Sequence, residues 1–234
     1  MKKNHLTRQI IAEFLGVAVF VSAIIGVASN NSSGLGALAA PIALGLMIVL
    51  LADVSGAHFN PVVSLFFFAR KDIKLSQFIS YVLAQLAGAV AGAALGAEIW
   101  NHAQPLTVNT VARSATVAEI ISEVFATAVL VWLTAKLARD GKTALIAPTV
   151  AAWYFAATVF TSTHAVMNPA VAFGRFFTPV TGATLSVDYG LELIVAQFGG
   201  TLLALILFGF ISAPGTRKSK TKKPAKITKV AKKK

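Results

Sequence analysis

The sequence contains no cysteine, and only nine of its 234 residues are acidic. Without cysteine there is no disulfide and no thiolate metal site, although this absence does not identify a compartment. Charged residues make up only 13% of the chain, whereas hydrophobic residues make up 56%, above the roughly 45 to 50% of soluble domains. The sequence also lacks a nucleophile with its base, a phosphate-binding loop and any cofactor motif, so we expect neither an enzyme nor a cofactor.

Apolar segments long enough to cross a bilayer, which takes about 20 residues, recur along the chain. We predict six of them, and therefore an all-α integral membrane protein. They cover residues 10–27, 37–52, 78–97, 118–135, 144–160 and 189–211.

The basic residues are unevenly distributed with respect to these segments. The formal net charge is +12, but ten of the 21 basic residues follow Pro214. Nineteen fall on one predicted side of the membrane, and only Arg113 and Arg175 fall on the other. Because cytoplasmic loops are enriched in Lys and Arg, we expect both termini and the loops after the second and fourth segments to be cytoplasmic.

The chain divides into three predicted regions: an N-terminus over residues 1–9, a membrane domain over 10–212 and a Lys-rich tail over 213–234. The tail has few apolar residues, so we expect it to be disordered. Anionic lipid headgroups would attract it by about 1 kcal/mol for each nearby Lys. No folded basic module accompanies the tail, so we do not expect nucleic-acid binding.

The membrane domain contains an internal repeat, with copies over about residues 10–97 and 118–211. The matching features, in the same order in both halves, are Glu13 with Glu123, Pro41 with Pro148, Asn60-Pro61-Val62 with Asn168-Pro169-Ala170, and Ala84-Gln85 with Ala196-Gln197. Each copy holds three spans, so the second copy enters the membrane from the opposite face. Inverted repeats of this kind place their functional site at the midplane, between the two copies.

Two short segments after the second and fifth spans predict half-helices. Residues 55–70 read SGAHFNPVVSLFFFAR, in which a loop precedes Asn-Pro and a short apolar run. Asn is favoured as a helix cap and Pro at the first helical position, so Asn60-Pro61 and Asn168-Pro169 each predict a helix start. A helix of about ten residues covers roughly 15 Å, half the hydrocarbon core, so two such helices can meet at the membrane centre.

Irregular backbone at that depth requires burial by protein or a water-filled cavity, so we expect a pore beside both loops. The two asparagines would offer donors at its centre, and the positive helix N-termini would disfavour cations there. We expect eight loop carbonyls to line the pore, those of Gly56, Ala57, His58, Phe59, His164, Ala165, Val166 and Met167. Neither loop histidine has partners arranged for binding metal, so we expect no metal site.

The segments SGAHFNPVV and MNPAVAFG resemble the two signature boxes of the aquaporin and glycerol-facilitator family, also called the major intrinsic proteins. The resemblance covers about residues 8–212, and Gln85 and Gln197 match two further residues of the family. It implies six transmembrane helices plus two re-entrant half-helices, a passive pore in each subunit for water or small uncharged solutes, and a homotetramer. It also implies that Glu13 and Glu123 brace the half-helix loops.

The chain departs from the family pattern where the outer constriction of the pore should lie. The arginine that usually follows Asn-Pro-Ala is Val171 here, and Val62 replaces the usual alanine of the first box. Counting from the second box places the other constriction residues at Ala165 and Ala156, with Ala40 or, if one helical turn is deleted, Leu44. These side chains predict a wide filter that is poor in hydrogen bonds.

Arg175 follows Val171 by one helical turn and therefore lies on the same face of the half-helix. Its charge could guard the pore mouth, or the side chain could reach for the membrane surface, and the sequence leaves both open.

The wide filter leaves the solute open among glycerol, urea, ammonia, hydrogen peroxide and dissolved gases. One alternative is a non-conducting membrane protein of the same fold that binds lipid or a partner, and another is an ion-coupled transporter. The membrane is also open: short loops favour a bacterial inner membrane, but a eukaryotic endomembrane would fit the basic tail.

Overall fold

The computed structural model describes residues 3–30, 34–101 and 108–212, so the predictions for the basic tail lie outside it. Every regular element in this part of the chain is helical, which confirms the predicted all-α class. The elements, in order, are α1 (Lys3–Ser29), η1 (Gly34–Leu38), α2 (Ala39–Ser55), α3 (Pro61–Ala69), α4 (Leu75–Ile99), α5 (Val117–Arg139), η2 (Thr143–Leu145), α6 (Ile146–Phe160), α7 (Pro169–Gly174), η3 (Arg175–Phe177) and α8 (Val187–Ile211).

Six of the helical stretches are long and apolar enough to cross a membrane, and each overlaps one of the six predicted spans. The second and fifth reach this length together with the short 3-10 helices that precede α2 and α6. The outside of the bundle is covered with large apolar side chains such as Val195 and Phe210, which is 81% exposed. This surface is suited to lipid, in which helices satisfy their own backbone hydrogen bonds.

The two halves are built around the same close helix contact. In the first half α1 packs along α4, and in the second α5 packs along α8. A Cβ atom added at Gly88 of α4 would lie 2.4 Å from the carbonyl oxygen of Phe14, and one at Gly200 of α8 would lie 2.6 Å from that of Val124. Glycine is therefore required at both crossings, as is common where membrane helices approach closely.

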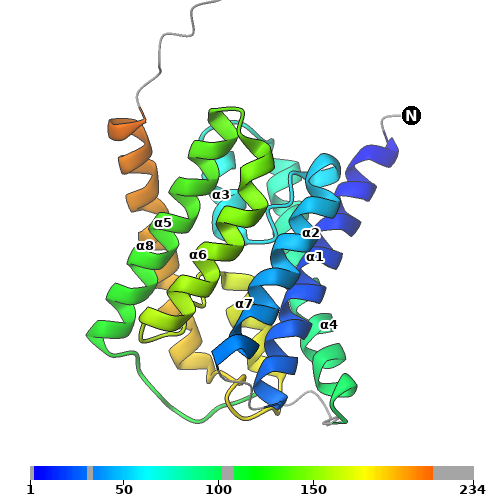
Figure 1. The fold of residues 1–234 in the computed structure, drawn as a ribbon, viewed down its shortest axis with the longest axis vertical. Coiled ribbons are helices and arrows are strands. Elements are labelled where there is room, and N and C mark those ends of the chain that lie inside the picture. Colours follow the sequence, from blue (N-terminus) through cyan, green and yellow to red (C-terminus); the bar gives the residue numbers. More distant parts are fainter. Residues whose placement is uncertain (1–2, 31–33, 102–107, 213–234) are drawn as a thin grey trace, which may run out of the picture.

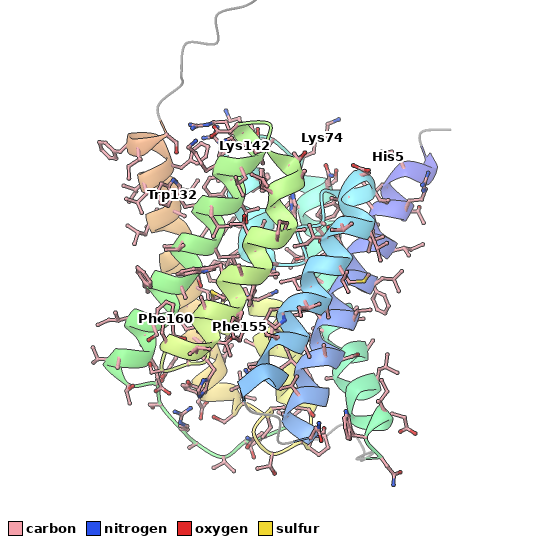
Figure 2. The ribbon with its side chains drawn as sticks, in the orientation of Figure 1. His5, Lys74, Trp132, Lys142, Phe155 and Phe160 are labelled. Carbon is pink, nitrogen blue, oxygen red and sulfur yellow. The ribbon has the colours of Figure 1, made fainter. Side chains whose placement is uncertain are left out.

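The half-helices α3 and α7 enter the bundle from opposite ends (Figure 1). α3 lies in the upper half of the view and α7 in the lower half, and both lie within the ring of long helices. The ends of α1 and α8 that lead to the chain termini both lie at the upper end, on opposite sides of the view. Figure 2 shows His5, Lys74 and Lys142 at this same end, so the basic loops lie on the side of the termini.

Candidate functional site

Each half-helix begins at an asparagine that caps it. The Asn60 Oδ1 atom accepts a hydrogen bond from the Val62 N–H at 3.0 Å, and the Asn168 Oδ1 atom accepts one from the Ala170 N–H at 2.9 Å. A proline occupies the first position of both helices. The cap satisfies donors that would otherwise be orphaned inside the membrane.

The two asparagines also connect the halves of the molecule. The Asn60 side-chain amide donates to the Met167 carbonyl at 2.8 Å, and the Asn168 amide donates to the Phe59 carbonyl at 2.9 Å. Two of the eight carbonyls expected to face the pore are therefore engaged in these cross-links. One of the two N–H bonds of each amide remains for other partners.

The loops before the asparagines contain several residues in the left-handed backbone region. Ala57 and Phe59 in the first loop, and Ala165 and Met167 in the second, have φ between 47° and 54°. Non-glycine residues rarely adopt this left-handed region, at a cost of roughly 1–2 kcal/mol each. The fold must hold such loops in place with other interactions.

Two buried glutamates provide those interactions. In the first half, Glu13 accepts hydrogen bonds from the backbone N–H groups of His58 and Phe59, the Ser55 hydroxyl and the Gln85 amide, at 2.6 to 3.0 Å. Glu123 repeats the pattern in the second half. Its partners are the N–H groups of Val166 and Met167, the Thr163 hydroxyl and the Gln197 amide, at 2.6 to 3.0 Å.

Two cavities lie along the bundle, and they contain most of the predicted pore residues. An inner cavity of about 280 Å³ is lined by both asparagines and by the first loop, Gly56, Ala57, His58 and Phe59. An outer cavity of about 610 Å³ is lined by His164, Ala165 and Val166 of the second loop. Met167 lines neither cavity, and its side chain is fully buried.

The structure brings together three of the five residues predicted for the outer constriction. Ala40, Ala165 and Val171 line the outer cavity. Leu44 does not, because it lies one turn further along α2 and lines the inner cavity.

Ala156 is a wrong prediction, since it is exposed and lines neither cavity. Successive residues of a helix are turned by about 100°, so Ala156 faces away from Tyr154 and Thr158, which do line the cavities. Counting back from the second box assumed a loop of family length after α6. No sequence signal marked the correct face, because nearly all residues of α6 are apolar.

Arg175 lies at the wall of the outer cavity. Its guanidinium donates to the carbonyl oxygens of Ala183, at 2.5 Å from Nε, and Gly182. Val62 has a different environment: its side chain is fully buried and packs with Val131 and Phe208, away from both cavities.

Known proteins share both the sequence pattern and this architecture. The sequence profile of the family described as "Major intrinsic protein" matches residues 1–181. The chain is 31% identical to the aquaglyceroporin AqpS of Rhizobium meliloti over 225 residues, which covers 92% of this chain and 94% of the relative.

The chain belongs to the major intrinsic protein family. It is also 32% identical to an aquaglyceroporin of Toxoplasma gondii, over 87% of this chain and 77% of that protein. The fold matches the crystal structure of the aquaglyceroporin from Plasmodium falciparum with a TM-score of 0.73 and 19% identity, over 89% of this chain and 98% of the other. The resemblance inferred from the two Asn-Pro motifs is thus confirmed.

Membership in this family establishes how the chain is located with respect to the membrane. This is a family of membrane channels, so the six apolar helices are transmembrane and the chain is an integral membrane protein.

Proposed function

We propose that the chain is a passive channel for water and small uncharged solutes, with the route running through the outer cavity, past Asn60 and Asn168, and into the inner cavity. The wall of the outer cavity carries this proposal, because Ala40, Ala165 and Val171 line it. None of these side chains is bulky or charged. A permeating molecule exchanges its hydration for the amides and loop carbonyls along the route.

The residues that line the outer cavity also favour the passage of solutes larger than water. A filter with Val171 in place of arginine offers few side-chain hydrogen bonds and leaves room for a solute such as glycerol or urea. Two relatives named aquaglyceroporins agree with this solute class. Ammonia and hydrogen peroxide fit the same chemical description.

Exclusion of cations would rest on two features. The N-termini of α3 and α7 point toward the asparagine pair, and the positive end of each helix dipole opposes a cation there. Arg175 adds a positive charge at the wall of the outer cavity. We assign it the role of a guard at the pore mouth, in a position displaced from that of the missing filter arginine.

We also propose a membrane orientation and an assembly. The nineteen basic residues on the side of the termini support cytoplasmic termini, and the bacterial relative supports a bacterial inner membrane. The family resemblance supports a homotetramer with one pore in each subunit. The Lys-rich tail would contact anionic lipid headgroups.

Stopped-flow light scattering on proteoliposomes tests the proposed function. We expect the native protein to accelerate both osmotic water efflux and the re-swelling that follows glycerol or urea entry. Val171→Arg restores the usual filter residue and should block the solutes while water still passes. If a native protein that is verified as folded does not exceed empty liposomes for water or any of these solutes, the channel assignment fails and the non-conducting alternative replaces it.

A further inference from the structure

The inner and outer cavities have a single lining residue in common among the residues that the structure describes, Tyr154 of α6. Its neighbours on the same helix face are divided between the cavities: Val150 lines the inner one, and Thr158 lines the outer one. Tyr154 itself is only 4% exposed. The phenol side chain therefore stands between the two cavities on the proposed route.

The ring of Tyr154 is held by an aromatic neighbour from the other half of the molecule. Phe20 of α1 packs against it edge to face, with ring centroids 5.2 Å apart and an interplanar angle of 79°. Phe20 is 2% exposed and lines the outer cavity. Aromatic rings prefer this edge-to-face arrangement, so the ring has a preferred position across the route.

Tyr154 lines the inner cavity together with Asn60 and Asn168, the two asparagines at the centre of the site. Each carboxamide has two N–H donors, of which one is used in the cross-link to the opposite loop. The remaining donors are those that a permeating oxygen atom would use. The phenol of Tyr154 thus shares a cavity with the donors that the central molecule of a permeating file would bind.

We propose that Tyr154 is the specificity-determining residue of this channel, with its ring limiting solute size and its hydroxyl competing with the permeant for the two asparagines. The inference rests on the proposed function, since it concerns the same route. It moves the discriminating position from the outer constriction, where the side chains are small, to the middle of the membrane. Water and slender solutes pass when the ring turns aside, and wider solutes do not.

Three variants separate the contributions of ring and hydroxyl. Tyr154→Val removes both, whereas Tyr154→Phe removes only the hydroxyl. Phe155→Val is the matched control, because Phe155 is an aromatic residue of the same helix that lines neither cavity. Proteoliposomes containing each full-length protein are assayed by stopped-flow light scattering with water, glycerol, erythritol and xylitol. Circular dichroism and size-exclusion chromatography establish that each variant is folded and assembled like the native protein.

We expect Tyr154→Phe to raise water permeability about fivefold, the equivalent of one hydrogen bond of about 1 kcal/mol, with an unchanged polyol cut-off. Tyr154→Val should in addition admit a longer polyol than the native protein admits, and Phe155→Val should behave as native. A native protein that does not conduct while Tyr154→Val does would overturn the proposal, because the side chain would then close the route instead of selecting among solutes.

The proposal is overturned if the native protein conducts and Tyr154→Val retains both its water permeability and its polyol cut-off. It is equally overturned if Phe155→Val shifts the cut-off as much as Tyr154→Val does, since loosened packing would then be the cause. In either case the channel function stands. If the native protein and every Tyr154 variant are folded but remain at the level of empty liposomes, the channel function fails together with the proposal.

Discussion

The side-chain amide of Asn60 donates to the carbonyl oxygen of Met167 at 2.8 Å across a sequence separation of 107 residues. The reciprocal bond joins Asn168 to Phe59. Since each asparagine also caps its own half-helix, the same two side chains start both half-helices and tie the two loops together. The centre of the candidate pore is therefore one cooperative unit built from both repeats.

This unit predicts non-additive mutations at the two asparagines. Asn60→Ala and Asn168→Ala each remove a cap, which typically costs about 1 kcal/mol, and a cross-link between buried loops. The second substitution should cost less than the first, because the loops are already released. Thermal unfolding of the detergent-solubilised single and double variants measures the coupling. Strictly additive losses would show that the loops are held independently.

Glu123→Gln should destabilise the second loop. Each oxygen of the Glu123 carboxylate accepts two hydrogen bonds, four in all. In the Glu123→Gln variant an NH2 group replaces one oxygen and can accept neither of the two hydrogen bonds made there. Hydrogen bonds to charged groups contribute about 1.5–3 kcal/mol each, so we expect a loss of at least about 2 kcal/mol and reduced transport.

The control is Glu98→Gln in α4, where the side chain is exposed. An exposed substitution should change the free energy of unfolding by less than about 0.5 kcal/mol. Equal unfolding midpoints for the two variants would mean that Glu123 does not brace the loop.

Gly88→Ala should separate α1 from α4. The added Cβ would lie 2.4 Å from the Phe14 carbonyl oxygen, which is backbone and cannot turn aside. We expect a cost of about 1–3 kcal/mol from overpacking, seen as a lower unfolding temperature. Gly209→Ala is the control, since no atom beyond its chain neighbours and its own helix backbone lies within 4 Å of its added Cβ. That variant should be neutral or slightly stabilised by its better helix propensity, and a similar loss at both sites would rule out close packing as the cause.

Arg175→Met tests the charge at the outer mouth. Without the guanidinium, the wall of the outer cavity loses its positive charge, and the carbonyl oxygens of Gly182 and Ala183 lose a hydrogen-bond donor. We expect conductance for methylammonium to rise in planar bilayers, whereas Arg175→Lys should keep it low. If Arg175→Met still does not conduct methylammonium, the residue anchors the Ala183 segment without guarding the pore.

Much of the fold could be predicted from the sequence because it depends on local pattern. The six spans follow from runs of apolar residues, and the starts of α3 and α7 follow from Asn-Pro, whose capping geometry involves only the next few residues. The pairing of Glu13 with Glu123 was visible as a repeat. The family resemblance implied that they brace the half-helix loops, but their individual hydrogen-bond partners were not visible, because these come from loops and helices distant in the chain.

The error at Ala156 shows that the sequence does not predict which face of a helix lines the cavity. A fixed count from the second box cannot register a change in loop length, and two residues along a helix turn a side chain by about 200°. The cavity faces of α2 and α6 became certain only in the assembled bundle. Tyr154 was missed for the same reason: in the sequence it is one aromatic residue among several in the fifth span.

The sequence by itself determined that the chain is an inverted-repeat membrane protein with two asparagine-capped half-helices, because hydropathy, capping and repetition act over short distances or by direct comparison of the two halves. Only the tertiary structure decided which side chains line the cavities, that the asparagines bond to the opposite loops, and that Tyr154 stands between the cavities. These relationships depend on the rotation of each helix about its axis and on the close approach of the two halves, which packing fixes.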